Sequence, residues 1–430
     1  MKTKFLSLIF FFCACIVNAQ TWDSLSAGVS GGTSSYGRVY ALSVYDGELH
    51  VGGGFYFAGN DSAIGIAKWN GATWSTFGSD NLNWVITFEV NGSELYVGGG
   101  FSGFPTSTDR HITQWNGTQW LSIHSLEPNV VSLAFYNGEL YAGQSFGSSS
   151  YISKWNGSVW TPVGSGVNNP VSELTVYNGE LYAAGSFTTA GGNTANYIAK
   201  WNGTSWTAVG NGTNYSVLAL AVHNGELYAG GNFTTAGGIT AKHIAKWDGI
   251  NWSEVGNGID TTVFELCSFN GELYAGGNFT IAGGNPANRI AKWDGVNWSA
   301  LGSGVDSTVY ALCGYNNELY AGGLFSNAGG IPAKRIARWN PLDIGFNENA
   351  NKVGVTVFPN PFSAATTLTL NKEIKNSVLS LYTIDGKEVR NTKFSGKNVI
   401  LEKEDLAGGI YFYKIKSPNE VIATGKLIIQ

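Results

Sequence analysis

The chain has 430 residues, 59 of them glycine, with 13% aromatic and 13% charged side chains. This composition is typical of an all-β protein whose sheets are covered on both faces and joined by frequent tight turns. Residues 21–350 hold 12 basic and 23 acidic side chains, a net charge of −11, whereas residues 351–430 hold 11 and 7, a net charge of +4. The acidic charge of the longer part argues against nucleic acid as a partner, because nucleic-acid binding depends on basic residues.

Residues 1–19 predict a secretory signal peptide. Two lysines precede an apolar stretch from Phe5 to Val17, and small residues before Gln20 form a cleavage site after Ala19. A lipoprotein signal through Cys15 is the alternative, although the residue three before it is the bulky Phe12. No later segment has 18 consecutive apolar residues, so the sequence predicts no membrane-spanning helix.

A unit marked by tryptophan repeats along residues 20–340. Its first tryptophan recurs at spacings of 46, 40, 46, 46, 46 and 46 residues, at Trp69, Trp115, Trp155, Trp201, Trp247, Trp293 and Trp339. A long, regular period of this kind indicates a repeat architecture. One unit reads as an apolar strand at 217–222, an Asn-Gly turn, a return strand at 226–231, a Gly/Thr/Ala loop, and two strands around Asp248-Gly249. Four short strands with two type I′ hairpins predict one propeller blade.

The phase of the repeat at the two ends predicts the number of blades. Residues 21–29 (TWDSLSAGV) match 297–305 (NWSALGSGV), so the mature chain begins with a fourth strand, and the last unit stops after the third strand at 336–340. We therefore expect a seven-bladed β-propeller over residues 20–340, with the strand at Trp22 paired beside the one at Trp339. Such a closure leaves no free sheet edge.

The Gly230-Gly231 pair followed by Trp247 and Trp252 resembles the repeats of kelch and galactose-oxidase-type propellers. The chain departs from kelch by having Trp where those repeats usually have Tyr on the third strand, so the resemblance implies a fold and not an activity. The galactose oxidase copper site needs a Tyr cross-linked to Cys and two His ligands. Here Cys267 and Cys313 lie on predicted core strands of neighbouring blades, and we expect two buried thiols, since facing sheets lie about 10 Å apart and a disulfide needs Cα atoms within about 7 Å.

Much of the charge and most tryptophans of the repeat have a structural explanation. Each unit has a Glu after its first turn, and six of seven have Lys or Arg before the marker tryptophan. In an antiparallel blade these positions are adjacent and predict cross-strand ion pairs. The two tryptophans per unit predict core packing.

The long second-to-third loops predict where a ligand could bind. In units four to seven they are nearly constant, as in FTTAGGNTAN at 187–196, whereas units one to three differ. Trp84 is the one tryptophan outside the repeat, and it precedes a first strand. Either it is wedged between two blades, or it is an exposed sugar platform beside other loop residues. For the platform, the ligand-binding candidates are Trp84, Tyr56, Asp61, Phe104, Asp109 and Arg110.

Three carboxylates, Glu89, Glu173 and Glu265, occupy positions of the first strands that face the ring axis. They could line a hydrated channel, hold Ca²⁺ or act as an acid/base pair. No catalytic or metal motif is present, so we expect no cofactor, with Ca²⁺ as an unsupported option.

After a linker at 341–352, residues 353–430 predict a small β-sandwich domain. Its motifs are Pro359-Asn360-Pro361, Asp385-Gly386-Lys387, Gly409 with Tyr411, and Gly425-Lys426. In order and spacing they resemble the C-terminal sorting domain (type A) of the type IX secretion system of Bacteroidetes; the alternative is a generic sandwich. The resemblance implies that the type IX machinery is a partner and that the protein is released or attached to the cell surface.

Three functions fit these features. The first is a binding or adhesion propeller that takes a glycan or a protein ligand. The second is a polysaccharide hydrolase or lyase that uses the axial carboxylates, and the third is a purely structural surface protein.

Overall fold

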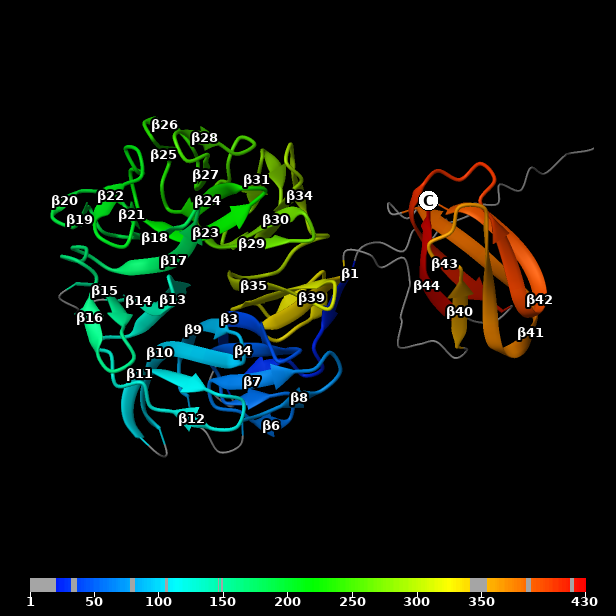
Figure 1. Ribbon diagram of the computed structural model, residues 1–430, viewed down its shortest axis with the longest axis horizontal. Helices are drawn as coiled ribbons and strands as arrows, with labels where there is room; N and C mark the ends of the chain where they lie inside the picture. Colours follow the sequence, from blue (N-terminus) through cyan, green and yellow to red (C-terminus); the bar gives the residue numbers. More distant parts are fainter. Residues whose placement is uncertain are drawn as a thin grey trace, which may run out of the picture. The chain divides into compact units, whose positions relative to one another are not determined.

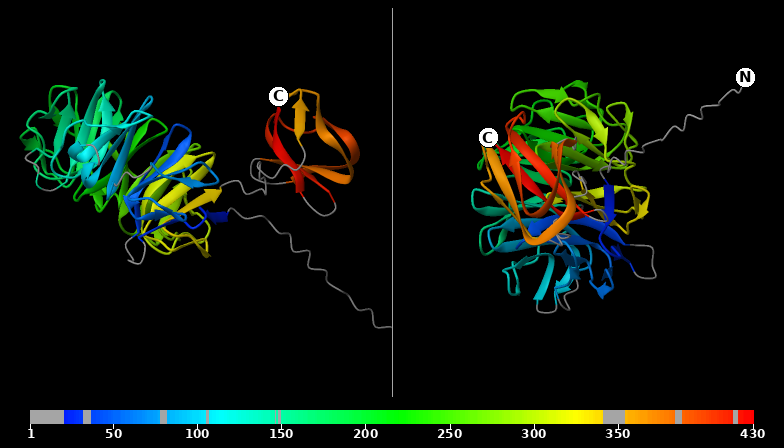
Figure 2. Two further views of the ribbon diagram at one scale, coloured as in Figure 1. Left: turned by 90° about the horizontal axis from the view of Figure 1, so that it is seen from below. Right: turned by 90° about the vertical axis from the view of Figure 1, so that its right-hand side faces the viewer.

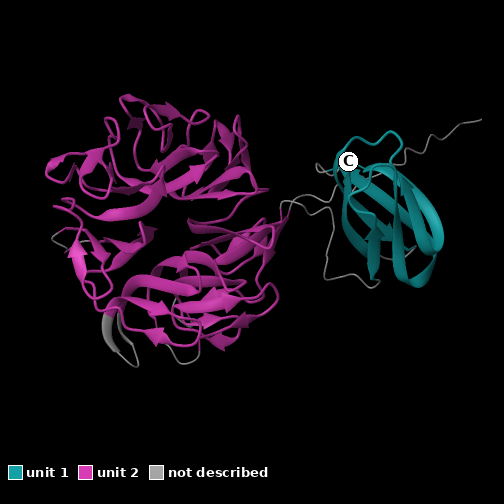
Figure 3. Cartoon of the chain, viewed as in Figure 1, with its two compact units in different colours: residues 1–20, 342–430 teal, residues 21–341 magenta. Residues whose placement is uncertain are grey.

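The computed structural model describes residues 21–31, 37–77, 82–104, 107–145, 147, 150–340, 354–383, 388–417 and 421–430, apart from the side chains of 102–109 and 421. The signal peptide, the linker and the Asp385-Gly386-Lys387 motif lie outside the described residues. The chain divides into two compact units, residues 21–341 and residues 342–430 (Figure 3). In the part of the chain that the structure describes, no helix is long and apolar enough to cross a membrane.

The first unit is a ring of seven four-stranded antiparallel sheets (Figures 1 and 2). We number the blades by the order of their marker tryptophans. Blades 1 to 3 consist of β3 (Arg38–Tyr45), β4 (Glu48–Gly54), β7 (Ile66–Trp69) and β8 (Trp74–Ser75); β9 (Val85–Asn91), β10 (Glu94–Phe104), β11 (Ser107–Trp115) and β12 (Trp120–Leu121); and β13 (Val130–Tyr136), β14 (Glu139–Gln144), β15 (Ile152–Trp155) and β16 (Trp160–Pro162).

The other four blades follow the same order from the axis outward. Blades 4 to 7 consist of β17 (Val171–Tyr177), β18 (Glu180–Gly185), β21 (Ile198–Trp201) and β22 (Trp206–Ala208); β23 (Val217–His223), β24 (Glu226–Gly231), β27 (Ile244–Trp247) and β28 (Trp252–Glu254); β29 (Val263–Phe269), β30 (Glu272–Gly277), β33 (Ile290–Trp293) and β34 (Trp298–Ala300); and β35 (Val309–Tyr315), β36 (Glu318–Gly323), β39 (Ile336–Asn340) and β1 (Thr21–Ser24).

The ring closes as the phase of the repeat predicts. The strand β1 pairs antiparallel with β39, and Trp22 lies opposite Trp339 in the register (Figure 1). The first strands contact one another in a complete circle, from β3 through β9, β13, β17, β23 and β29 to β35 and back to β3. The prediction of seven blades is therefore confirmed, and no blade is left with a missing fourth strand.

Tryptophans pack each blade and tie it to its neighbour. The two tryptophans of every blade lie with their ring centroids 5.1–5.4 Å apart. In six blades the fourth-strand indole also donates a hydrogen bond of 2.9–3.2 Å to a carbonyl just after the preceding blade, as Trp252 Nε1 does to Val209 O. These residues therefore have a structural task, as the sequence predicts.

The two turns of a blade differ. The first is a type I′ hairpin in six blades, because both central residues have positive φ, as at Asn224 (48°) and Gly225 (79°), whereas in blade 2 only Gly92 of the turn has a positive φ. The type I′ prediction is wrong for the second hairpin, which is a four-residue loop between paired tryptophans. There the Asp248 Oδ1 accepts hydrogen bonds from the amides of Ile250 and Asn251. The hydrogen bonds of the Asp side chain thus stabilise this longer loop in place of the type I′ turn that the sequence suggested.

We call the end of the ring with these turns the short-turn face and the opposite end the long-loop face. On the long-loop face five blades carry a small ribbon, formed by β5 (Phe57–Ala58) and β6 (Asp61–Ser62) with β2 (Val29–Ser30), and by β19 (Thr189–Ala190) and β20 (Asn193–Thr194), β25 (Thr235–Ala236) and β26 (Ile239–Thr240), β31 (Ile281–Ala282) and β32 (Asn285–Pro286), and β37 (Asn327–Ala328) and β38 (Ile331–Pro332). Blade 1 therefore shares the loop of blades 4 to 7, although its sequence predicted a divergent one. Its loop keeps the buried Phe55, Ala58 and Ala63, which lie where the other ribbons have Phe and Ala.

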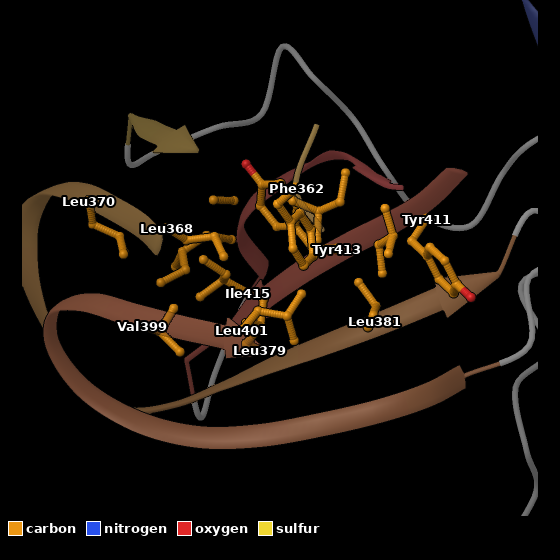
Figure 4. Packing of buried hydrophobic residues seen from close by; sticks show 14 of the residues in the cluster. Phe362, Leu368, Leu370, Leu379, Leu381, Val399, Leu401, Tyr411, Tyr413 and Ile415 are labelled. Carbon is orange, nitrogen blue, oxygen red and sulfur yellow. The ribbon is translucent and has the colours of Figure 1, made fainter. Parts of the chain in front are cut away.

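The second unit is a small β domain of five strands, β40 (Val355–Phe358), β41 (Ala365–Thr383), β42 (Glu388–Glu402), β43 (Gly409–Lys416) and β44 (Val421–Ile429). The first half of β41 pairs with β40 and the second half with β43, while β42 pairs along both halves. The curved strands enclose a core that includes Leu368, Leu381 and Ile415 (Figure 4). The fold class is therefore a seven-bladed β-propeller followed by a small β domain.

Candidate functional site

Trp84 stands at the long-loop face, directly before the first strand of blade 2. Half of its surface is exposed (51%), and its backbone has φ = 70°. In other blades the carbonyl at this position accepts a hydrogen bond from the amide that follows the second strand, as Ser216 does from Asn232. The Trp84 carbonyl keeps this bond and accepts it from the Gly100 amide at 2.9 Å. A positive φ costs a non-glycine residue about 1–2 kcal/mol. The ring therefore holds a large, exposed side chain in an unfavourable backbone conformation.

The indole of Trp84 begins a row of aromatic rings across four blades. Tyr40 of blade 1 stacks on it with a centroid distance of 6.1 Å and an interplanar angle of 21°. Tyr310 of blade 7 lies 5.5 Å from Tyr40, and Phe264 of blade 6 lies 5.3 Å from Tyr310. Arg38 donates a hydrogen bond of 3.0 Å to the Tyr40 hydroxyl. We call Phe264, Tyr310, Tyr40 and Trp84 the aromatic row.

Sequence reasoning missed three members of this row. Tyr40, Phe264 and Tyr310 each follow the first valine of a first strand, where the other blades have Ile86, Val131, Ser172 and Leu218. All three are partly exposed. Alignment of the units would have shown this aromatic position. Its continuity with Trp84 depends on ring closure, which makes blade 7 the neighbour of blade 1.

The other predicted ligand residues are placed apart from the row. Tyr56 and Asp61 are exposed on the ribbon loop of blade 1. Arg110 pairs with Glu127 at 3.5 Å, and that carboxylate also contacts the His111 ring. The side chains of Phe104 and Asp109 lie outside the described residues. The ring partner of Trp84 is thus Tyr40 rather than a member of the predicted set.

The three axial carboxylates come from blades 2, 4 and 6. Glu89 accepts a hydrogen bond from the Phe135 amide of blade 3, and Glu173 accepts one from the Ser132 hydroxyl of the same blade. Burial raises the pKa of Glu89 to about 7 and that of Glu173 to about 8. Burial, followed by the charge of Glu173, raises the pKa of Glu265 well above its usual range. Since alternate blades influence one another, these side chains converge on the axis.

The two cysteines lie one blade apart on neighbouring first strands. Cys267 and Cys313 are free thiols, as predicted, and each is partly rather than fully buried. Burial raises the pKa of Cys313 to about 12, with the charge of Glu265 adding to the shift. A thiol with a raised pKa is a poor nucleophile, so these residues act as packing groups beside the axial carboxylates.

Metal ligands do not gather in the described part of the molecule. Among those residues, no group of three or more His, Cys, Asp or Glu side chains could hold a metal ion. Two of the axial carboxylates, Glu89 and Glu173, instead accept hydrogen bonds from the neighbouring blade. Binding of Ca²⁺ therefore stays a prediction without a coordinating geometry to support it.

Three of the four motifs of the second unit lie in its described residues. The Asn360 side chain donates to the Lys426 carbonyl and accepts from the Ile428 amide at 2.8 Å. The Pro359 carbonyl accepts a hydrogen bond from Thr366, and Pro361 forms a cis peptide bond with Asn360. In the other two motifs, the Tyr411 hydroxyl donates to the Ala407 carbonyl, and Gly425 lies against Tyr413, with no room for a side chain; Gly409 has φ = 154°.

Sequence comparisons identify the second unit and part of the ring. Residues 356–430 match the family described as "Secretion system C-terminal sorting domain". Residues 178–202 match a beta-propeller domain of unknown function, DUF5122. Comparison with curated proteins gives no match. A type IX sorting domain implies secretion or display at the outer-membrane surface, and it implies that the chain engages the type IX secretion system. The chain is thus a secreted β-propeller protein with a type IX sorting domain.

Solved structures of low sequence identity are similar to this chain. The extracellular domain of the putative hybrid two component system BT4673 from B. thetaiotaomicron has 12% identity and a TM-score of 0.50 over 96% of this chain. PorZ of Porphyromonas gingivalis, described as an essential surface component of its type-IX secretion system, has 14% identity and a TM-score of 0.45 over 91%. The chain spans 60% and 59% of these two structures. A fungal alcohol oxidase in complex with copper has 12% identity and a TM-score of 0.47 over 96% of this chain and 100% of its own.

Proposed function

We propose that this chain is an exported binding propeller that takes a saccharide on the aromatic row. The observation that carries the proposal is Trp84, an exposed indole kept at positive φ and stacked on Tyr40. Strained residues of this kind persist where the surrounding structure over-determines them, and they cluster at functional sites. A kelch-type repeat and signal cleavage after Ala19 are parts of the proposal, supported by the Gly-Gly and tryptophan pattern and by residues 1–19.

The shape of the row suits sugar rings. Four aromatic side chains from consecutive blades offer a surface on which several sugars can stack, and the Arg38 guanidinium beside Tyr40 supplies a polar group that orients hydroxyls. The row lies where the first strands begin, at the long-loop face. Loops and strand ends on a rigid scaffold are the usual place for binding residues.

Catalysis by the axial carboxylates is the less supported alternative. Glu89 and Glu173 are hydrogen-bonded to the neighbouring blade, which gives both a structural role. The positions of Tyr56, Asp61 and Arg110 support them only as peripheral contacts, because the stacking partner of Trp84 is Tyr40.

A glycan array probed with the full chain tests the proposal. Wild-type protein is expected to bind a subset of glycans without releasing products. Trp84→Ala and Tyr40→Ala should each weaken that binding about 2- to 10-fold, since an aromatic pair contributes about 0.5–1.5 kcal/mol beyond the area that it buries.

Tyr215 provides the matched control. It is 57% exposed and stacks on Tyr197 at the junction of blades 4 and 5, and no ring contact among the described residues joins this pair to the row. Tyr215→Ala should leave binding unchanged. Equal losses in Tyr215→Ala and Trp84→Ala, or product release that survives Trp84→Ala, would refute the proposal.

A further inference from the structure

The basic side chains of the propeller divide into two groups by location. Residues 21–340 contain 12 Lys and Arg. Six of them form the predicted cross-strand pairs with Glu, at distances of 2.7–3.3 Å: Lys68, Lys154, Lys200, Lys246, Lys292 and Arg338. The other six, Arg38, Arg110, Lys242, Arg289, Lys334 and Arg335, all lie at the long-loop face. The repeat therefore pairs the cations of its blade walls with Glu, whereas the other six lie on one face, where Arg110 pairs with Glu127.

Four of these cations lie on blades 5 to 7. The backbone carbonyls of Lys242 and Lys334 bond the loop that follows their blade, at the amides of Ile259 and Val29, which places both residues on the long-loop face. Both lysines are exposed. Among the described residues, neither they nor Arg289 and Arg335 have a carboxylate within 4.0 Å. The charge of these four side chains is thus available to a ligand.

The acidic residues of the same region are already engaged. Asp306 accepts from the Ser326 amide and from the Asn327 side chain, and Asp260 accepts from the Thr280 amide and hydroxyl. These bonds fasten the ribbon of each blade to the preceding loop. With the exposed Glu254 at the end of β28, three carboxylates stand against four cations, which leaves one net positive charge on this part of an acidic ring.

The two arginines reach toward the aromatic row. Arg335 Nη1 donates to the Leu324 carbonyl, and the Leu324 amide bonds the Thr308 carbonyl, two residues before Tyr310. In blade 6, Arg289 Nη1 donates to the Phe279 carbonyl at 3.1 Å, next to Asn278, whose amide bonds Thr262. Thr262 is in turn two residues before Phe264. Each guanidinium therefore lies close to the end of a first strand that carries a member of the row.

A hollow lies at the same place, beside residues with a positive φ. Asn288, Arg289, Asp306 and Asn327 line a hollow of about 300 Å³ between blades 6 and 7. Arg289 and Arg335 have φ of 68° and 67°, and the same position has a positive φ in the other five blades, at Gly65, His111, Tyr151, Tyr197 and His243. Glycine suits this conformation better than arginine. The positive φ thus belongs to the repeat, and the hollow between blades 6 and 7 is the feature that supports a site here.

We propose that the long-loop face of blades 5 to 7 binds the acidic groups of an anionic polysaccharide, whose sugar rings lie on the aromatic row. The inference rests on the proposed function for the sugar and adds the charge of the ligand. Lys242 and Lys334 supply mobile ammonium groups, while Arg289 and Arg335 supply guanidinium groups fixed by backbone carbonyls. Carboxylate and sulfate are the anions that such groups bind in a directed way.

The test compares charged and neutral polysaccharides on the full chain. Polygalacturonate and dextran sulfate represent the two anion sources, and methyl-esterified polygalacturonate and dextran are their neutral counterparts. We expect at least one anionic polymer to bind about 10-fold more tightly than its neutral counterpart, with affinity falling as salt rises because screening weakens exposed charge contacts. The arm that binds identifies carboxylate or sulfate as the recognised group.

A double variant tests whether the anionic polymer binds at Lys242 and Lys334. Lys242→Gln with Lys334→Gln should weaken binding of the anionic polymer about 5-fold, since exposed charge contacts each contribute modestly. Lys200→Gln with Lys246→Gln removes the same charge from the ion pairs of the blades and should change affinity less than about 2-fold. Equal losses in both double variants would mean that only net charge matters and would overturn the inference.

The outcomes separate this inference from the saccharide proposal. Equal binding of anionic and neutral polymers that depends on Trp84 would refute the anionic surface and leave the stacking proposal standing. Anionic binding that is lost in the Lys242/Lys334 variant but survives Trp84→Ala would refute stacking and leave the surface standing. Failure of all four polymers to bind would overturn the anionic surface.

Discussion

The two faces of the ring are built from the same repeat but differ in how their polar groups are used. On the short-turn face nearly every charge has a partner, as in the Lys200–Glu180 pair at 2.7 Å, and tyrosines bind the turn of the next blade, as Tyr177 does at Gly225. On the long-loop face, Lys242 and Lys334 have no carboxylate partner among the described residues, and Trp84 is exposed at positive φ. The comparison teaches that the repeat pairs its charged and polar groups with one another on the face that serves stability alone.

The largest expected effect concerns the closure of the ring by β1, and it tests whether the stability of the propeller depends on that closure. Deleting Thr21–Ser24 removes the pair Trp22–Trp339 and the Asp23–Arg338 ion pair, and exposes the edge of β39. We expect the free energy of unfolding to fall by about 5 kcal/mol or more, since loss of one buried tryptophan alone costs about 3–5 kcal/mol. Urea denaturation followed by tryptophan fluorescence measures this. An unchanged midpoint would mean that the seventh blade does not need its fourth strand.

A pair of tryptophan variants compares a tryptophan that packs inside a blade with one exposed on the long-loop face. Trp252→Ala removes a side chain that is 7% exposed and its hydrogen bond to Val209, so we expect a loss of about 3–5 kcal/mol. Trp84→Ala should cost less than about 1 kcal/mol, because surface changes have small effects. Chemical denaturation of both variants gives the two values. Similar losses would make Trp84 a packing residue.

The axial carboxylates predict a pH dependence of stability. Burial raises the folded-state pKa of Glu173 to about 8, so the folded protein holds this proton more tightly than the unfolded chain. The free energy of unfolding should therefore fall as the pH rises from the ordinary glutamate pKa through this value. Glu173→Gln should flatten that fall and make the variant more stable at alkaline pH by on the order of 2 kcal/mol.

Denaturation at a series of pH values tests this prediction. Glu180→Gln is the control, because that carboxylate belongs to a surface pair with Lys200. The control should keep the pH dependence of the wild type. The same slope in wild type and Glu173→Gln would show that this carboxyl group does not carry the dependence.

The smallest effect compares two lysines of opposite faces. Lys200→Gln should lower stability by about 0.2–1 kcal/mol, the range for exposed ion pairs, and a double-mutant cycle with Glu180→Gln isolates that coupling. Lys242→Gln should leave the melting temperature unchanged, since its side chain has no hydrogen bond or ion pair among the described residues. Equal losses would remove the contrast between the faces.

Local patterns in the sequence determined the frame of this protein. The 46-residue period and the complementary ends predicted seven blades and the Trp22–Trp339 register, because closure of a propeller is a matter of counting strands. The Glu and Lys positions predicted their ion pairs, since neighbouring strands of a blade are joined by short turns. The motifs around Asn360 and Gly425 predicted the sorting domain in the same way. The type I′ prediction was wrong for the second hairpin because hydrogen bonds to one Asp side chain determine the conformation of that loop.

Only the tertiary structure decided what meets at the long-loop face. The aromatic row joins Phe264 and Tyr310 to Tyr40 and Trp84, residues up to 270 positions apart, across the junction where blade 7 meets blade 1. Glu89, Glu173 and Glu265 converge for the same reason, since alternate blades face one axis. Contacts between blades depend on the curvature of the whole ring, a property that no single repeat encodes.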